Sequence, residues 1–258
     1  MTTSRGIAYV LLFLSWTALA EDHQSKNLVF TLPNVPAGIM IDGQRFDVPL
    51  TGRVHVERED ETLRASVTIN ADLASLQKGL PGVMRRRVNR NDNCNEIIDI
   101  HTITLSPESP SLRVEVAAHY EDWECPWTEV LGQRVSLPPQ RLFEQNGSAT
   151  FALMPETNGN SVAIRVDVRK VDIDGFLGNL LRTDVFGPLI RDVILQSVPR
   201  MIDVGNIEQQ LPAALKGLPI RLTNVSFVNR DSSSLGLRVE ATITAEGRTA
   251  DVAWEHLQ

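Results

Sequence analysis

The feature that most constrains the fold is a long apolar stretch with helical spacing, residues 174–218. Apolar residues recur there at every fourth position: Leu177, Leu181, Val185, Leu189 and Val193. Residues four apart lie on one face of an α-helix, so the spacing predicts helices with a wide apolar face. Gly187-Pro188 divides the stretch into two helices, and a third is expected over residues 207–218. Such a face must be buried, for instance against a sheet.

Much of the remaining chain alternates apolar and polar residues, as half-buried antiparallel strands do. Asp42-Gly43 between two short apolar runs predicts a hairpin. One further helix is expected over residues 73–86, capped by Asn70 or Asp72 and shortened or kinked by Pro81. Other expected strands cover residues 28–32, 54–56, 63–69, 97–105, 112–120, 149–153, 162–168, 222–228, 235–243 and 250–254.

These elements predict an α+β fold, with an antiparallel β-sheet packed on long helices. We expect a β-rich half over residues 21–125, an irregular connector over 126–147, and a half with the long helices over 148–258. Residues 73–115 and 207–240 each read as a helix followed by two strands, which favours two similar halves. The alternative is that helix-plus-hairpin units recur by chance.

The first residues have the pattern of a secretory signal. Arg5 precedes an apolar core over residues 6–17, and Ala18-Leu19-Ala20 fits the cleavage rule, so a signal peptide is expected over residues 1–20. No later stretch reaches the roughly 18 uninterrupted apolar residues of a spanning helix. The sequence therefore predicts an exported chain, periplasmic or extracellular, without a transmembrane segment.

The net charge argues against one class of partner, and the two cysteines predict a disulfide. The formal net charge is −7, and an acidic chain argues against nucleic acid as its main partner. The only two cysteines are Cys94 and Cys125. In an oxidising compartment they are expected to form a disulfide that closes a loop of about 30 residues. A metal pair is the alternative, but no second cysteine or close histidine completes a ligand set.

Two clusters are candidate sites. Arg85, Arg86 and Arg87 end the first helix, and either contact an anionic headgroup or phosphate or form a solvated helix end paired with local acids. The second cluster consists of His119, Glu121, Asp122 and Glu124. These types can ligate a divalent cation, but strand alternation spreads them over both faces, so no metal site is expected. The neighbouring tryptophans, Trp123 and Trp127, are expected to pack over the disulfide rather than to stack on a sugar.

Motifs for catalysis are missing from the sequence. It contains no nucleophile elbow, no paired-histidine zinc motif and no phosphate-binding glycine loop, and its five histidines are scattered. We therefore expect a non-catalytic protein without a cofactor.

The pattern of residues 171–244 resembles the tubular lipid-binding superfamily, which includes the bactericidal permeability-increasing proteins and takeout-like carriers. The matching features are the apolar run 176–198, the helix end Leu215-Lys216-Gly217-Leu218-Pro219, and the strands 220–228 and 235–243. The Gly187-Pro188 break departs from the single unbroken helix that the family favours. The resemblance implies a long helix inside a strongly curved antiparallel sheet.

The resemblance also implies an apolar seam that admits acyl chains, with the arginine cluster as a headgroup contact. The lining residues would be Phe176, Leu180, Val185, Phe186, Leu189 and Val193. The alternative is that these side chains fill a dry core. The function expected from the sequence is thus non-catalytic binding of a lipid or other hydrophobic ligand. The competing hypothesis is a structural or protein-interaction module of the cell envelope, with a solid core and a protein partner.

Overall fold

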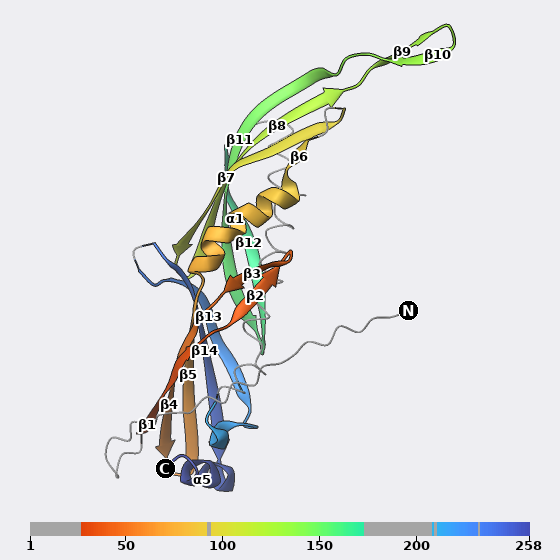
Figure 1. Ribbon diagram of the computed structural model, residues 1–258. Coiled ribbons are helices and arrows are strands. Elements are labelled where there is room, and N and C mark those ends of the chain that lie inside the picture. The colour runs from red at the N-terminus through yellow and green to blue at the C-terminus, as the bar shows by residue number, and fades with distance from the viewer. Residues whose placement is uncertain (1–26, 92–93, 173–207, 209–210, 232) are drawn as a thin grey trace, which may run out of the picture.

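Antiparallel strands dominate the computed structural model, with 66% of the described residues in strands and 15% in helices (Figure 1). The structure describes residues 27–91, 94–172, 208, 211–231 and 233–258. Two five-stranded sheets follow one another along an elongated body, and two short hairpins extend from them.

The first sheet has the strand order β1-β4-β5-β14-β13, and all neighbouring strands are antiparallel. Its strands are β1 (Asn27–Val35), β4 (Leu50–Glu59), β5 (Thr62–Asp72), β14 (Leu235–Glu246) and β13 (Ile220–Asn229). At its centre, β5 pairs with β14, so that Asp72 lies opposite Gly236 and Thr62 opposite Glu246. Strands from both ends of the chain therefore share this sheet.

The second sheet has the order β12-β11-β8-β7-β6, again antiparallel throughout. Its strands are β12 (Ser161–Asp172), β11 (Gln140–Asn158), β8 (Ser111–Glu124), β7 (Glu96–Glu108) and β6 (Arg90–Asn91). The register shifts at His101 in β7 and at Leu142 in β11. Each shift leaves one residue without a partner in the ladder, which is the signature of a β-bulge.

Two hairpins complete the strands. The first joins β2 (Gly38–Ile41) to β3 (Gln44–Asp47) through Asp42 and Gly43, whose φ angles are 49° and 76°. Positive φ at both turn residues is what a tight two-residue hairpin requires, and the predicted hairpin is confirmed. The second joins β9 (Trp127–Val130) to β10 (Gln133–Ser136) and projects from the end of the body (Figure 1).

Helix α1 (Ala74–Val88) confirms the helix expected after the fifth strand. The Asp72 carboxylate accepts a hydrogen bond from the Ala74 amide at 2.9 Å, so Asp72 caps its first turn. One face of α1 is buried against β3, β7 and β14. Gly79 faces the β2–β3 hairpin so closely that a Cβ there would overlap the Phe46 ring. The other helical elements that lie within the described ranges are α5 (Gly247–Glu255) and the 3-10 turn η2 (Ala213–Leu215).

A single apolar core runs through both sheets. Gln77 of α1 joins them, because its Nε2 donates to the Leu105 carbonyl of β7 at 2.8 Å while its Oε1 accepts from the Leu235 amide of β14 at 3.0 Å. Phe227 of β13 is 1% exposed, and its amide donates to the Pro110 carbonyl at the β7–β8 turn at 3.0 Å. The two sheets are thus held together by both packing and backbone hydrogen bonds.

The predicted α+β fold on long helices is wrong for the described chain, which is mostly antiparallel sheet with only two short helices. Several strands are longer than the apolar segments that predicted them. Strand β11, for example, spans 19 residues, and its first part, residues 140–147, is mostly polar. Each sheet also takes strands from both sides of the expected connector. The predicted helical block over residues 174–206 lies outside the described residues.

Three local predictions also need correction. Residues 127–136, expected within an irregular connector, form the β9–β10 hairpin. Residues 250–254, expected as a strand, belong to helix α5, because Ala250, Ala253 and Trp254 are buried at helical spacing. Within the expected helix over 207–218, Glu208 is helical, but the continuous described part, residues 211–218, forms the 3-10 turn η2 in place of an α-helix.

The predicted disulfide between Cys94 and Cys125 is confirmed, with a Cα–Cα distance of 4.9 Å. It closes the open end of the β7–β8 pair, just before β9 begins. Among the described residues, no helix has both the length and the apolar character needed to cross a membrane.

Candidate functional site

The candidate ligand site is an open, mostly apolar cavity of about 710 Å³ at the α5 end of the first sheet. Helix α5 supplies one wall, the segment around η2 another, and Phe30 of β1 part of the floor. Its lining residues are Phe30, Pro212, Ala213, Ala214, Leu218, Arg248, Thr249, Val252, Ala253, His256 and Leu257. Small-molecule sites in proteins have volumes of roughly 300–1,000 Å³ and mostly apolar walls, so its size and composition suit a ligand.

Helix α5 is held in place from both ends. The Gly247 amide donates to the Glu61 carbonyl at 2.8 Å, and Gly247 takes a φ of 54° that favours glycine. Arg58 of β4 donates to the Asp251 carboxylate at 2.6 Å, and its guanidinium lies 6.0 Å from the centre of the Trp254 ring. The side of α5 that carries Val252 and His256 is thereby presented to the cavity.

Polar groups in the cavity wall are few and mainly basic. Arg248 is exposed and forms no ion pair with any described residue. The Nδ1 atom of His256 lies 2.7 Å from the Val252 carbonyl oxygen, so Nδ1–H donates this hydrogen bond. An apolar cavity with a guanidinium at its wall suits an amphipathic molecule with an acidic head.

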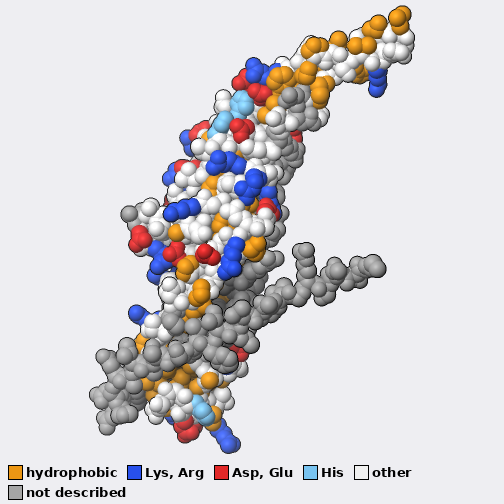
Figure 2. Space-filling view, viewed as in Figure 1, with side chains coloured by type: hydrophobic (Ala, Val, Ile, Leu, Met, Phe, Trp, Pro, Cys, Tyr) orange, Lys and Arg blue, Asp and Glu red, His pale blue; other side chains and the backbone are white. Residues whose placement is uncertain are grey.

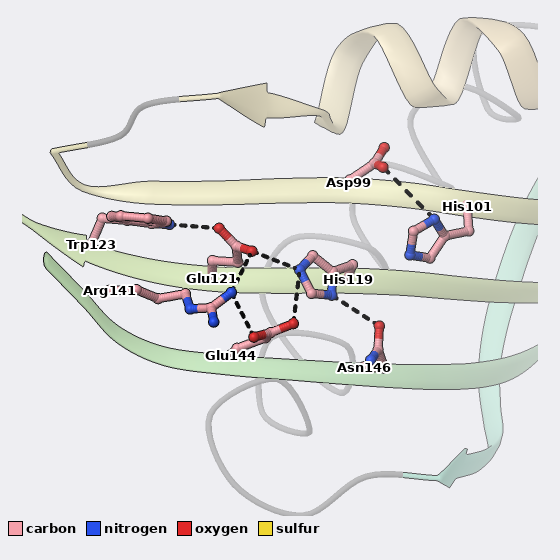
Figure 3. A network of polar contacts seen from close by, with 8 residues as sticks. All are labelled: Asp99, His101, His119, Glu121, Trp123, Arg141, Glu144 and Asn146. Carbon is pink, nitrogen blue, oxygen red and sulfur yellow. Dashed lines mark hydrogen bonds and ion pairs between the residues drawn. The ribbon is translucent and has the colours of Figure 1, made fainter. Parts of the chain in front are cut away.

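A second candidate site is a polar network on the outer face of the second sheet (Figure 3). His119 and Glu121 lie on one face of β8, and Glu144 and Asn146 lie opposite them on β11. The His119 ring nitrogens contact two oxygens, Nε2 with Glu121 Oε1 at 3.1 Å and Nδ1 with Asn146 Oδ1 at 2.9 Å. Both nitrogens can donate together only when the ring is protonated.

The β-bulge in β11 brings a basic side chain to this network. Because Leu142 is the extra residue in β11, Arg141 falls on the same face as Glu144 and not on the opposite one. Its Nη1 lies 2.6 Å from Glu144 and 3.3 Å from Glu121. His101, at the bulge of β7, lies near this network, with 6.0 Å between its ring centre and that of His119.

The network shifts the pKa values of its two central groups. The hydrogen bond to Glu121 raises the pKa of His119 above its usual range, with smaller contributions from the Asn146 hydrogen bond and from the charges of Glu121 and Glu144. The hydrogen bond from His119 lowers the pKa of Glu121, and one from the Trp123 indole at 2.6 Å acts in the same direction. Both shifts favour the charged pair of a His119 imidazolium and a Glu121 carboxylate over the neutral forms.

We expect the stabilising effect of His119 to depend on pH. The pKa of His119 is higher in the folded protein than in the unfolded chain, where it is about 6.5. The stabilisation by His119 is therefore fully present below pH 6.5 and is lost as the pH rises through the pKa of the folded state. An NMR titration should place the His119 midpoint above that value, and Glu121→Gln should lower it. In denaturant melts, His119→Gln should be destabilising at acidic pH and close to neutral in effect at alkaline pH. Equal losses at both would contradict the assignment.

His119, Glu121 and Glu144 also offer ligand atoms within 4.8 Å of one another, a set that Zn²⁺ accepts. However, Arg141 and protonated His119 together balance the two carboxylates, so the network is complete as a set of ion pairs. We assign no metal to it. The expectation of no cofactor and no catalysis stays a prediction.

The arginine cluster does not form part of the cavity. Arg87 makes a bidentate ion pair with Asp42, which lowers the pKa of Asp42, and Arg86 donates to the Gln44 side chain at 2.9 Å. Both therefore hold the β2–β3 hairpin against α1, while Arg85 is exposed. The six predicted lipid contacts, Phe176, Leu180, Val185, Phe186, Leu189 and Val193, lie outside the described residues.

Sequence reasoning identified His119 and Glu121 but missed their partners on β11 and the whole cavity. The tryptophans also differ in role: Trp123 donates to Glu121, and Trp127 is 54% exposed with the Arg134 guanidinium 4.0 Å from its ring centre. Alternation along β8 separates His119 and Glu121 from Asp122 and Glu124, as expected. No signal in the sequence indicates which residues of β11 face them.

Comparisons with protein-family models, with curated proteins and with solved structures find no match to this chain.

Proposed function

We propose that this protein binds an amphipathic hydrophobic molecule, an acyl chain with an acidic head, in the cavity at α5. The observation that supports this is the apolar cavity of about 710 Å³ with Arg248 and His256 in its wall. Burial of a flexible chain against Leu218, Val252 and Leu257 would supply most of the affinity, because apolar area removed from water is the main favourable term.

The basic wall would select the head of the ligand. Arg248 has no ion-pair partner among the described residues, so a carboxylate could form a charge-assisted hydrogen bond with its guanidinium. The function is that of a carrier or sensor and not of an enzyme, in agreement with the sequence-based expectation. The superfamily resemblance, which rests on residues 171–244, is compatible with this role and stays a hypothesis.

A binding titration with a dansyl-labelled fatty acid tests the proposal. We expect saturable binding to the wild type and a loss of at least about tenfold in Val252→Asp, because a carboxylate would enter the apolar wall. Val252 is 48% exposed, so the fold should tolerate the change. Val29→Asp is the matched control, since Val29 is 40% exposed and lies outside the cavity lining.

The methyl ester of the same fatty acid tests the head contact. Arg248→Gln should weaken binding of the acid and leave binding of the ester unchanged, because the ester carries no charge. The proposal fails if the wild type binds neither probe, or if Val252→Asp and Val29→Asp bind the acid equally well.

A further inference from the structure

The β9–β10 hairpin is the most exposed apolar part of the described chain. All eight residues of the two strands are exposed, and hydrophobic side chains gather along the protruding end in Figure 2. Its large apolar residues are Trp127 at 54%, Val130 at 50%, Leu131 at 100% and Val135 at 43% exposure. Large contiguous apolar patches are rare on monomeric soluble proteins and often mark interaction sites with proteins or membranes.

The tip of the hairpin is unusual in its backbone as well. Leu131 occupies the first turn position with a φ of 55°, followed by Gly132 at 77°. Asn, Asp or Gly is the usual choice at the first position of such a turn, because a bulky side chain is disfavoured at positive φ. A fully exposed leucine there is unfavourable both for the backbone and for solvation. Strain of this kind gathers at functional positions.

The two faces of the hairpin differ in polarity. Residues directly opposite one another share a face, and successive residues alternate. One face carries Thr128, Val130, Gln133 and Val135, and the other carries Trp127, Glu129, Arg134 and Ser136. The first face continues to Leu137, whose amide donates to the Pro126 carbonyl at 2.8 Å. The two valines therefore lie on one face, and the charged pair Glu129–Arg134 lies on the other.

We propose that the β9–β10 hairpin inserts into the interfacial region of a lipid bilayer. The order of residues from the tip follows that of a membrane: Leu131 and Val130 come first, the Glu129–Arg134 pair lies behind them, and Trp127 lies at the base with its ring against Arg134. Tryptophan and arginine with an apolar body and a polar end are suited to the headgroup level. This inference goes beyond the proposed ligand-binding function and does not depend on it, because the cavity lies at the opposite end of the molecule (Figure 1).

The same residues indicate how deeply the hairpin inserts and which lipid surface it binds. A two-stranded hairpin has unpaired backbone groups along both edges, which cannot be satisfied in hydrocarbon, so only the tip can enter the acyl boundary. Glu129 lies opposite Arg134, so the hairpin has no net charge, while the whole chain carries −7. Attraction to anionic lipid therefore cannot drive the contact, and we expect binding to a zwitterionic surface that is insensitive to salt.

Flotation of the full chain with phosphatidylcholine vesicles tests the proposal. We expect the wild type to float with the vesicles at low and at high salt, and Leu131→Asp to lose at least about tenfold in partitioning, since a buried leucine side chain is replaced by a charge. Aspartate tolerates positive φ, so this variant should fold. Met40→Asp, at a residue that is 54% exposed on β2, is the matched control and should float like the wild type.

Quenching by brominated lipid provides a second readout. Bromine-labelled phosphatidylcholine should quench tryptophan fluorescence in the wild type and not in Trp127→Phe. The proposal is overturned if the wild type does not float, if Leu131→Asp floats like the wild type, or if high salt releases the protein. Val252→Asp should float normally and Leu131→Asp should still bind the dansyl fatty acid, so failure of one proposal is distinguishable from failure of the other.

Discussion

Replacement of Phe227 by alanine is expected to lower the free energy of unfolding by about 3–5 kcal/mol. The ring is 1% exposed, and it lies on β13, the strand of the first sheet that packs against β7, β8 and β11 of the second. A cavity at this position would remove contacts to both sheets, because the apolar core is continuous through them. Equilibrium unfolding in denaturant, followed by fluorescence and by circular dichroism, measures the loss.

Phe143→Ala is the control for this prediction, because it removes the same ring from a residue that is 42% exposed. Its cost should stay below about 1 kcal/mol, as for most surface substitutions. A single shared transition that moves as a whole in Phe227→Ala would support one cooperative core. Two separate transitions, of which Phe227→Ala shifts only one, would show that the sheets unfold independently.

Removal of the disulfide is expected to cost about 3–4 kcal/mol in the double variant Cys94→Ser, Cys125→Ser. The bond joins residues 31 apart in sequence, and without it the unfolded chain regains the freedom of that loop. Cys94 is exposed and Cys125 is half-buried, so serine should cause little loss of packing in the folded state. Denaturant melts of the double variant and of the wild type provide the measurement.

Reduction of the wild type with dithiothreitol should lower the free energy of unfolding by the same amount as the double substitution. This comparison separates the effect of the bond from that of the serine substitutions. A loss below about 1 kcal/mol would mean that the loop between the cysteines stays ordered after unfolding, for instance through residual pairing of β7 with β8. The hairpin β9–β10 follows Cys125 directly, so its amide exchange rates would also report whether the bond anchors it.

The local elements that could be predicted are those whose burial leaves a pattern in the sequence. Alternation identified β4, β5, β7 and β8, and the Asp42-Gly43 turn identified the first hairpin. The β9–β10 hairpin left no such pattern, because neither of its faces is buried and its turn begins with Leu131. For α5, nine residues are too few to separate the two periods: Ala250, Val252 and Trp254 fit a strand, whereas Ala250, Ala253 and Trp254 fit a helix and are the buried set.

The sites depended on contacts that sequence spacing does not contain. The cavity is formed where α5, η2 and β1 meet, from three segments far apart in the chain. The polar network needs the register of β11 against β8, together with a bulge that moves Arg141 to the face of Glu144. Patterns within one strand placed His119 beside Glu121 but could not supply these partners.

The central pairing of β5 with β14 also sets the order in which the molecule can assemble. Synthesis proceeds from the N-terminus, so β1, β4 and β5 can associate long before β14 exists. Until then, β5 presents an open edge of amide and carbonyl groups, a template on which strands of other chains can aggregate. Pairing of strands so far apart in sequence is also slow, so the edge of β5 stays open to aggregation for longer. We therefore expect yield on refolding to fall steeply with protein concentration, and added peptide of residues 235–246 to protect the edge.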